Sequence, residues 1–352
     1  MVVRPGGELD RFELRDELGV GASGTVYRVL DRSRGEEVAL KALRKLSGAD
    51  LYRFKREFRA LVGVEHPNLV ALHELFAVDD EWMFTMELVA GERFDRWVRP
   101  AAPLMIEDHG DATVMTPRPG PGTGVLDEAR LRAALVQLAD AVTALHAAGW
   151  VHRDVKPSNV LVEPGGRAVL LDFGLVIDPH VVDRTHEGSS VGTVAYMSPE
   201  QAADLPVGPA TDWYAVGVML YEALAGQRPI RGPAHEVMLR KQLEDPPHPG
   251  SVTAGVPPDL DRLCMRLLDR DPGRRPDGPA VLAALGASPS PATLAVRTAA
   301  AADPHVGDDA ALVRLREAYA ASRDHLTIVA IAGADEPTRR ALLGAFLTEV
   351  RR

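Results

Sequence analysis

The sequence predicts an α+β fold in which a strand-rich part precedes a helical part, and two patterns carry that prediction. Residues 12–90 contain short segments rich in β-branched and aromatic residues, with one helical stretch among them. Residues 125–285 show helical periodicity almost throughout. A chain of 352 residues is long enough for two domains, or for one large domain with an appendage, since domains usually hold roughly 100–200 residues.

The first part is expected to hold five strands and one helix. The helix should cover residues 49–62, because Leu51, Phe54, Phe58 and Leu61 fall at helical spacing. Glycines separate the first two strands, and an acidic turn separates the last two. The expected strands are residues 12–18, 25–31, 37–43, 69–78 and 82–89.

Helices dominate the second part. Residues 127–149 predict a long amphipathic helix, and residues 209–226 predict a strongly apolar, buried one. Residues 99–124 are dense in proline, glycine and threonine, which is typical of a surface insertion, and residues 286–304 are expected to be a linker. Residues 305–352 then predict a helix at 308–322, a strand at 326–332 and a last helix from about Thr338.

Composition excludes several classes of protein. Hydrophobic residues make up 46% and charged residues 26%, as in an ordinary soluble globular protein. The net charge is −10 and no run of basic residues stands out, so no nucleic-acid partner is expected. The first residues lack the apolar core of a signal peptide and no apolar run reaches about 18 residues, so we expect a cytoplasmic protein without a membrane span.

Cysteine and histidine give no sign of a metal centre. The single cysteine, Cys264, excludes an intrachain disulfide and a cysteine-based zinc cluster, and is expected to be a small buried hydrophobe on a helix. His180 and His186 lie among polar loop residues without a third ligand, and His152 is expected to pack rather than catalyse. Lysine is scarce, since only five of the 40 basic residues are lysine, so a lysine at a chemically demanding position carries information.

The first chemical signal is the sequence GVGASG at residues 19–24. A dinucleotide-binding fold would need a helix directly after these glycines, but residues 25–29 continue as a strand. A glycine-rich hairpin can lay backbone N–H groups over phosphates, because glycine has no Cβ in the way. A plain hairpin turn is the alternative.

A lysine and two later motifs add a charged set. Lys41 lies in an apolar strand, where a lysine needs a partner such as Glu57 unless it sits at an edge and reaches solvent. The sequences HRDVKPSN at 152–159 and DFG at 172–174 follow. One cation and three oxygen donors, of the kind required by a nucleoside triphosphate with divalent metal ions, come from Asp154, Lys156, Asn159 and Asp172.

In this order the motifs resemble those of the bacterial eukaryotic-like (Hanks-type) Ser/Thr protein kinases, over residues 12–285. The resemblance implies a bilobal protein-kinase fold, with an antiparallel sheet plus one helix in the N-lobe (12–90) and a mainly helical C-lobe (91–285). It also implies ATP, Mg²⁺ or alternatively Mn²⁺, and protein substrates with Ser or Thr acceptors. Dimerisation is left open.

The resemblance implies a role for each matching residue. Lys41 would grip the α- and β-phosphates and pair with Glu57, Asp154 would be the catalytic base, and Lys156 would neutralise charge on the γ-phosphate. The metal ions would be held by Asn159 and Asp172. The residues implied around ATP are Gly19, Val20, Gly21, Gly24, Val26, Ala39, Met86 as gatekeeper, Glu87, Val89 and Leu161.

Further residues carry structural or regulatory roles by the same resemblance. The Lys156–Pro157 pair and the sequence YMSPE at 196–200 resemble the Ser/Thr-specific pattern. Arg153 would meet a phosphorylated residue of the activation segment, for which the candidates are Thr185, Ser189 and Ser190, with ordinary solvated loop hydroxyls as the alternative. Phe173 and Gly174 complete the metal-binding motif. Thr193 would bond near Asp154, Glu200 would pair with Arg275, and Asp212 would anchor the catalytic loop.

Residues 305–352 would form a short αβα extension that resembles the opening of AAA-like or STAND ATPase modules. Gly333 aligns with the first glycine of their GxxxxGK[ST] loop, but Thr338, Arg339 and Arg340 replace the later glycine, lysine and hydroxyl. Pro337 also lacks a backbone N–H, so no nucleotide is expected there.

Two other functions compete with an active protein kinase. A catalytically weak scaffold would typically have lost the strand lysine, the catalytic aspartate or the metal aspartate, and all three are present. A small-molecule kinase would not need the peptide-docking segment at 192–200.

Overall fold

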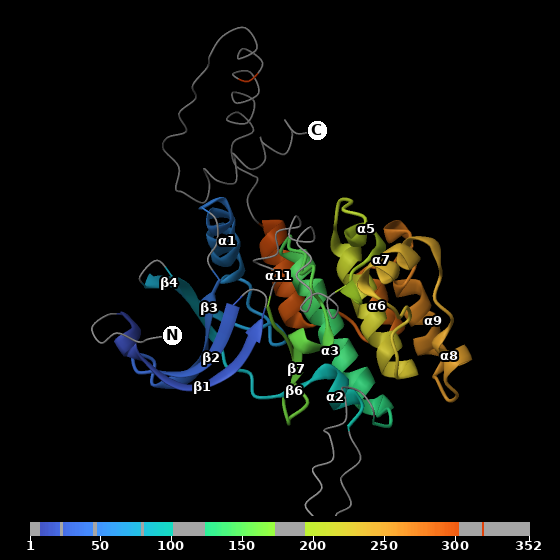
Figure 1. The fold of residues 1–352 in the computed structure, drawn as a ribbon, viewed down its shortest axis with the longest axis horizontal. Helices are drawn as coiled ribbons and strands as arrows, with labels where there is room; N and C mark the ends of the chain where they lie inside the picture. The colour runs from blue at the N-terminus through green and yellow to red at the C-terminus, as the bar shows by residue number, and fades with distance from the viewer. Residues whose placement is uncertain are drawn as a thin grey trace, which may run out of the picture. The chain divides into compact units, whose positions relative to one another are not determined.

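The structure, a computed structural model, divides into two compact units, Met1–Leu294 and Ala295–Arg352. The first unit carries strands followed by helices, as the sequence predicts (Figure 1). In the second unit the described residues are the end of one helix and Tyr319, which is helical. The residues that the structure describes are 8–21, 24–44, 48–78, 81–100, 124–172, 194–302 and 319.

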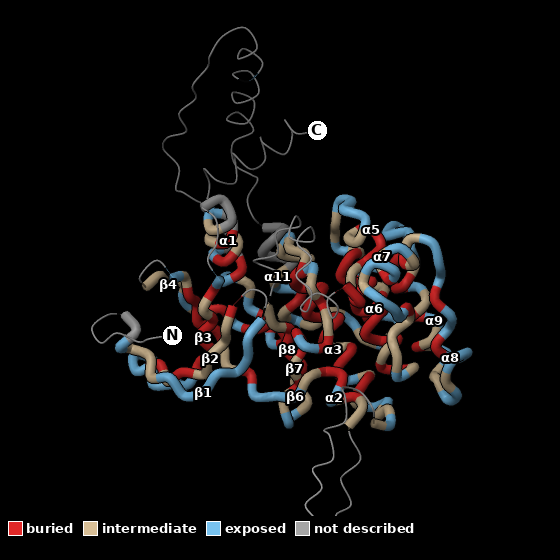
Figure 2. The backbone as a smooth tube through the Cα atoms, viewed as in Figure 1, coloured by how far each residue is buried: buried red, intermediate tan, exposed pale blue. Residues whose placement is uncertain are grey.

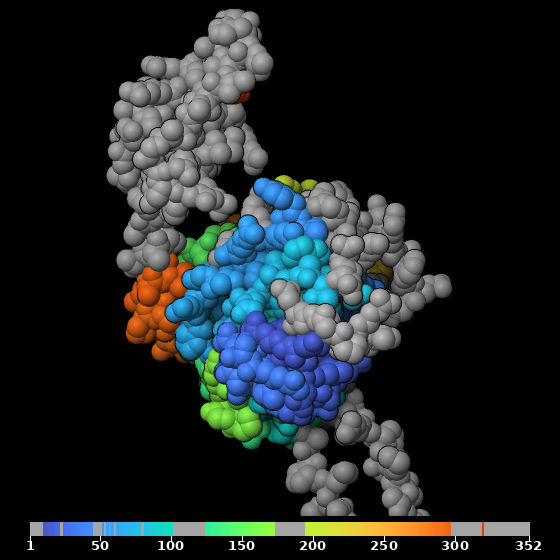
Figure 3. Space-filling view, turned by 90° about the vertical axis from the view of Figure 1, so that its left-hand side faces the viewer, coloured from blue at the N-terminus to red at the C-terminus, as the bar shows by residue number. Residues whose placement is uncertain are grey.

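A five-stranded sheet forms the N-terminal part and confirms all five predicted strands. Every neighbouring pair is antiparallel, in the order β1-β2-β3-β5-β4. β3 therefore lies in the middle of the sheet. Figure 3 shows the surface of this N-terminal part, coloured blue to cyan. The strands are β1 (Phe12–Gly21), β2 (Gly24–Asp31), β3 (Glu36–Leu43), β4 (Leu72–Val78) and β5 (Glu81–Glu87).

Helix α1 (Gly48–Leu61) is the only α-helix among the described residues of this part, and it packs on the sheet through aromatic side chains. Phe54 and Phe58 are buried, and their ring centroids lie 5.9 Å and 5.4 Å from that of Phe84 on β5. Side chains four residues apart share one face of a helix, so this pair gives α1 its buried side.

The C-terminal part is mainly helical, with a small three-stranded sheet of β6 (Glu92–Arg93), β7 (Val160–Val162) and β8 (Ala168–Leu170). Local signals set the ends of its two longest helices. Asp127 caps the first by accepting the N–H of Arg130, and Gly226 ends the second with a φ of +69°. The helices are α2 (Phe94–Val98), α3 (Glu128–Ala147), α5 (Pro199–Ala202), α6 (Pro209–Ala225), α7 (Ala234–Leu243), α8 (Pro249–Val252), α9 (Pro258–Leu267), α10 (Gly278–Ala284) and α11 (Pro291–Ala302).

One hydrophobic cluster runs through both parts of the first unit. It includes Ala39 and Phe54 from the N-terminal part and most of the buried residues of α3 and α6, where the buried backbone is densest (Figure 2). A smaller cluster formed by Val29, Val38, Leu40 and Met83 lies apart from it. Cys264 is fully buried on α9, which confirms the prediction made for it.

The interval 286–304, predicted as a linker, contains helix α11, and the boundary between the two compact units falls within it, after Leu294. Two local signals that favour a helix, an alanine-rich sequence and a proline in the first turn, were not used in that prediction. Ser290 and Thr293 also bond to the buried carboxylate of Asp140 on α3, so this interval begins as part of the core.

Other predicted features lie outside the described residues. They include residues 101–123 of the predicted insertion, most of the helix at 308–322, the strand at 326–332 and the last helix. None of the helices within the described ranges is long and apolar enough to cross a membrane.

Candidate active site

The glycine-rich segment closes a β-hairpin. Gly19 lies opposite Val26, and Gly21 lies opposite Gly24, so β2 follows the glycines directly. This excludes the dinucleotide-binding alternative, which needs a helix there. Gly24 has a φ of +149°, and a Cβ on it would lie 2.0 Å from the Ala42 carbonyl oxygen, whereas a Cβ on Gly19 would meet no described atom within 4 Å. Gly24 therefore shapes the hairpin, and Gly19 leaves open backbone of the kind that phosphates approach.

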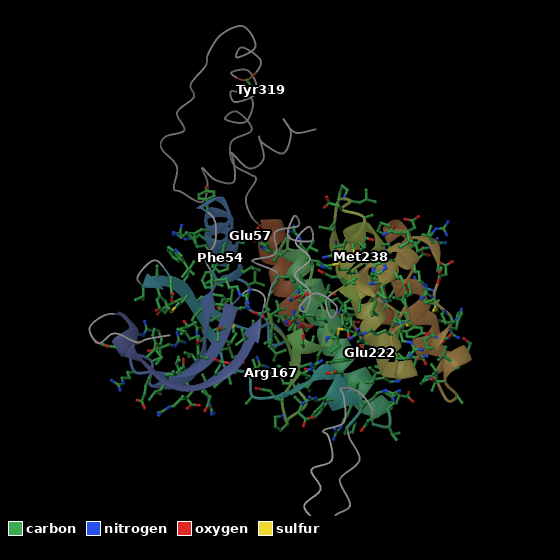
Figure 4. All side chains as sticks on the ribbon, in the orientation of Figure 1. Phe54, Glu57, Arg167, Glu222, Met238 and Tyr319 are labelled. Atoms are coloured by element: carbon green, nitrogen blue, oxygen red, sulfur yellow. The ribbon has the colours of Figure 1, made fainter. Side chains whose placement is uncertain are left out.

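Lys41 is buried in the middle of the sheet. It lies opposite Val26 on β2 and Phe84 on β5, which excludes the edge-strand alternative. Its side chain is 6% exposed, and Nζ donates a hydrogen bond to Oδ1 of Asp172 at 2.6 Å. The pairing of Lys41 with Glu57, which lies on α1 (Figure 4), stays a prediction.

Five apolar residues predicted around adenine belong to the main hydrophobic cluster of the unit or pack against it, namely Val26, Ala39, Met86, Val89 and Leu161. Two of them, Ala39 on β3 and Met86 on β5, lie opposite each other in the sheet. Val20, also predicted near ATP, is 65% exposed on β1.

Glu87, one of the residues predicted to lie around ATP, makes hydrogen bonds through both its backbone and its side chain. Its N–H donates to the Ala71 carbonyl at 2.8 Å, and its carboxylate accepts from Nη1 of Arg167 at 2.5 Å. Arg167 (Figure 4) also donates from Nε to the Pro67 carbonyl at 2.8 Å, and its pKa is raised chiefly by the hydrogen bond to Glu87. The sequence analysis missed Arg167, because an arginine in a turn between short strands carries no chemical pattern.

Three of the predicted catalytic residues, Asp154, Lys156 and Asn159, form one hydrogen-bonded group. Nζ of Lys156 donates to both carboxylate oxygens of Asp154, at 2.9 Å and 2.7 Å. Nδ2 of Asn159 donates to Oδ2 of Asp154 at 3.0 Å and to its backbone oxygen at 2.8 Å. The carboxylate of Asp154 is thereby fixed in orientation. Oδ1 of Asn159 accepts a long hydrogen bond from Oγ of Ser158 at 3.4 Å and keeps a second lone pair for another ligand.

Asp212 anchors the backbone of the catalytic loop, residues 152–159, as the resemblance to protein kinases implied. The buried carboxylate accepts the N–H of His152 at 2.8 Å and of Arg153 at 2.7 Å. Nε2 of His146 lies 2.7 Å from it. Arg153 has a φ of +67°, which is uncommon outside glycine, and these two N–H bonds hold it there.

His152 joins the catalytic loop to the strand that leads to Asp172. Its Nδ1 accepts the N–H of Asp154 at 3.3 Å, so Nε2 carries the proton that it donates to the Leu171 carbonyl at 2.8 Å. The N–H of Leu171 donates in turn to the Asn159 carbonyl at 2.7 Å. His152 is 1% exposed, in keeping with a packed residue. This loop therefore sets the positions of Asn159 and Asp172 relative to each other.

The chemistry of Asn159 and Asp172 suits a hard divalent cation. The amide oxygen and the carboxylate are the ligand types that Mg²⁺ prefers, with phosphate oxygens and water completing its shell. Asp172 lies two residues after the end of β8, with a φ of +49° and a side chain 36% exposed, so its carboxylate is accessible.

Glu200 and Arg275 form the predicted lock between α5 and the segment before α10. Nη1 and Nη2 of Arg275 donate to the two carboxylate oxygens at 2.7 Å and 2.8 Å, and both side chains are buried. Thr211 adds a hydrogen bond at 2.9 Å. Burial opposes ionisation of Glu200, but the hydrogen bonds from Arg275 prevail and its pKa lies below the ordinary value.

The sequence analysis also missed Lys241. Its ammonium is buried and bonds to three backbone carbonyls between residues 194 and 197. The scarcity of lysine was the available signal, but no motif surrounds Lys241. Six other residues given a role from the sequence lie outside the described ranges, namely Phe173, Gly174, Thr185, Ser189, Ser190 and Thr193.

Comparison with known proteins agrees with this site. The family model "Protein kinase domain" matches residues 12–284. The chain is 35% identical over 295 residues to the serine/threonine-protein kinase PkaA of Streptomyces coelicolor, covering 78% of this chain and 49% of that protein. It is 36% identical over 293 residues to the DNA damage-responsive serine/threonine-protein kinase RqkA of Deinococcus radiodurans, covering 82% and 41%.

A solved structure gives the same fold. The twitchin kinase region from C. elegans superposes with a TM-score of 0.62 at 25% identity, covering 83% of this chain and 48% of that one. The chain spans about half the length of the curated relatives it matches. Because the family model covers most of the chain and the catalytic motifs lie within it, the chain belongs to the protein kinase family.

Proposed function

We propose that this chain is an ATP- and Mg²⁺-dependent protein-serine/threonine kinase, as the names of its relatives suggest. One observation carries the proposal, namely that the groups needed for phosphoryl transfer meet in one place. Lys41 and Asp172 are in contact, and Asp154 is bonded to Lys156 and Asn159 on the loop that also leads to Asp172. No member of the set is replaced.

The proposed mechanism relies on positioning and charge. The hairpin of residues 19–24 covers the phosphates, and the ammonium of Lys41 binds the α- and β-phosphates. Asp154 accepts a hydrogen bond from the Ser or Thr hydroxyl and orients its oxygen towards the γ-phosphorus, while Lys156 stabilises the charge on the transferred group. Such orientation removes much of the entropic barrier, and the fixed charges stabilise a loose transition state.

The metal would be held by Oδ1 of Asn159 and the carboxylate of Asp172. When bound, Mg²⁺ neutralises charge on the phosphate oxygens. Mn²⁺ prefers the same oxygen ligands and is the alternative. Restoring activity to EDTA-treated protein with each cation separately compares the two.

The experiment that tests the function is transfer of label from [γ-³²P]ATP to a peptide library with a central Ser or Thr. The control is Asp154→Asn, which keeps the shape of the side chain but removes its charge. We expect the wild type to label the library and the variant to lose at least about a hundredfold in kcat, the lower end of what general acid–base catalysis contributes. Equal labelling by both proteins would refute the assignment, and no labelling by either would favour a binding scaffold.

Regulation by phosphorylation belongs to the same proposal. The resemblance to protein kinases implies that Arg153 binds a phosphorylated residue of the segment that carries Thr185, Ser189 and Ser190, and we infer that the protein phosphorylates itself there. Mass spectrometry of ATP-treated protein checks this. Full activity with all three residues unmodified would contradict it.

We infer that residues 305–352 are an incomplete P-loop ATPase-like segment that binds no nucleotide, because Thr338, Arg339 and Arg340 replace the phosphate-binding residues of that loop. Photolabelling by 8-azido-ATP should therefore map to residues 12–285 alone. The protein is proposed to act in the cytoplasm on protein substrates, and dimerisation is open to measurement.

A further inference from the structure

Lys241 on α7 is a buried charge that the proposed mechanism does not use. The residue is 1% exposed, and Nζ donates to the carbonyls of Val194 at 2.9 Å, Ala195 at 2.7 Å and Met197 at 2.5 Å. Among the described residues no carboxylate forms an ion pair with it. A buried ammonium without a counter-charge is unfavourable unless polar groups solvate it. Here three carbonyl oxygens of one short segment solvate the ammonium.

The number of acceptors fits lysine in particular. An ammonium has three N–H bonds arranged as a tripod, whereas a guanidinium is a planar fork and a neutral amine has two N–H bonds. Burial, together with the positive charge of Arg228, lowers the pKa of Lys241 to about 7. The ring of Tyr214 lies 5.5 Å from Nζ. Only the protonated side chain satisfies all three carbonyls.

Apolar packing also holds the segment that Lys241 binds, residues 194–197, against α7. Val194 packs with Ile230 and with Val237 of α7, and Met197 and Met238 border that cluster (Figure 4 labels Met238). Apolar packing fixes the depth of a segment but does not fix the direction of its carbonyls. The tripod of hydrogen bonds supplies that direction.

The same segment continues into contacts with the catalytic loop. Ser198 caps α5 by accepting the N–H of Gln201, and Nε2 of Gln201 donates to the Arg153 carbonyl at 2.9 Å. Arg153 precedes Asp154. Tyr196 donates to Glu222 of α6 (Figure 4). Residues 194–201 thus lie between α7 on one side and the loop that carries Asp154 on the other.

We propose that Lys241 is a positioning residue for peptide substrates, which sets the backbone of residues 194–197 beside the catalytic loop. This inference rests on the proposed kinase function. The hydrogen bonds of Lys241 go to residues 194–197 and not to the residues proposed to bind ATP, so its loss should weaken peptide binding and leave ATP binding intact.

The test compares Lys241→Met with Arg240→Met in the full chain. Methionine keeps the length of the side chain and removes its donors, and Arg240 is the next residue on α7 but bonds to exposed Glu244. The assay uses the best peptide that the wild type selects from the Ser/Thr library. We expect Lys241→Met to raise the KM for that peptide by about tenfold, with the KM for ATP and the slow hydrolysis of ATP without peptide within twofold of wild type.

A second variant covers the case in which methionine prevents folding. Lys241→Gln retains two N–H donors, and should raise the peptide KM by less than Lys241→Met. Cleavage by limited proteolysis at residues 194–198 should increase in the order wild type, glutamine, methionine. An unchanged peptide KM in a folded variant, or an equal rise in the KM of ATP and peptide, would overturn the inference. An inactive wild type would instead refute the kinase function itself.

Discussion

At the scale of single residues, two glycines of one hairpin are expected to behave differently. Gly24→Ala places a Cβ 2.0 Å from a backbone oxygen at a φ of +149°, whereas Gly19→Ala meets no described atom. The first should lower the free energy of unfolding by about 2–4 kcal/mol, because strain and a clash add. Gly19→Ala should leave the free energy of unfolding unchanged and raise the KM for ATP by about tenfold, because its methyl group would occupy the space proposed for the phosphates.

Urea unfolding and ATP kinetics on the same preparations measure these two effects separately. Gly35→Ala is the control for strain without a clash, because Gly35 has a φ of +69° and open space around it. A Gly24→Ala protein as stable as Gly35→Ala would show that the hairpin adapts to the methyl group, contrary to this expectation.

The buried ion pair of Glu200 with Arg275 is expected to contribute to the stability of the fold. Glu200→Ala leaves the guanidinium of Arg275 buried without a counter-charge, so it should lower the free energy of unfolding by about 3–5 kcal/mol. Because folding lowers the pKa of Glu200, its stabilisation is present above the ordinary value of 4.5 and is lost as the pH falls below that value. The free energy of unfolding measured in urea should therefore change less between pH 7 and pH 4 for Glu200→Ala than for the wild type.

The exposed pair Arg240–Glu244 provides the control for that experiment. It is also an Arg–Glu pair with a short separation, 2.8 Å, but water screens both side chains. Glu244→Ala should leave the midpoint of unfolding where it is. If both variants behave alike, burial is not what distinguishes the Glu200–Arg275 pair.

At the scale of elements, the start of α11 is tied to α3 through one buried polar group. Oγ1 of Thr293 donates to Asp140 at 2.7 Å, and Nε2 of His66 lies 3.1 Å from the same Thr293 oxygen. Thr293→Val keeps the shape and removes these bonds, so roughly 1–2 kcal/mol of unfolding free energy should be lost. Thr253→Val, whose hydroxyl makes one bond of 3.3 Å, should lose less in the same thermal melts. Equal losses would indicate that α11 is not held by Thr293.

Elements were predicted well where one local pattern decides them. Alternation and turn residues located all five strands of the sheet, and the spacing of Phe54 and Phe58 located α1. The contacts of Glu200 with Arg275 and of Asp212 with the catalytic loop were predicted from the resemblance to the protein kinases. The contact of α11 with Asp140, and the contacts of Arg167 and Lys241, could not be predicted in this way, because the partners lie far away in the sequence: Asp140 for Thr293 of α11, Glu87 for Arg167, and residues 194–197 for Lys241.

At the scale of the first unit, one core joins the sheet to the helices, so both parts should unfold together. The main cluster contains Phe84 of β5 as well as Leu138 of α3, and disrupting either part exposes apolar surface of the other. Tryptophan fluorescence can report on the two parts of this unit separately, because Trp82 lies on β5 and Trp213 is buried on α6.

Trp82→Phe removes the fluorescent probe of the sheet and leaves the probes of the helical part. Fluorescence melts of this variant and of the wild type should have the same midpoint as loss of far-ultraviolet circular dichroism. A wild-type transition in two steps, with the earlier step absent from Trp82→Phe, would mean that the sheet unfolds first and that the shared core does not couple the two parts.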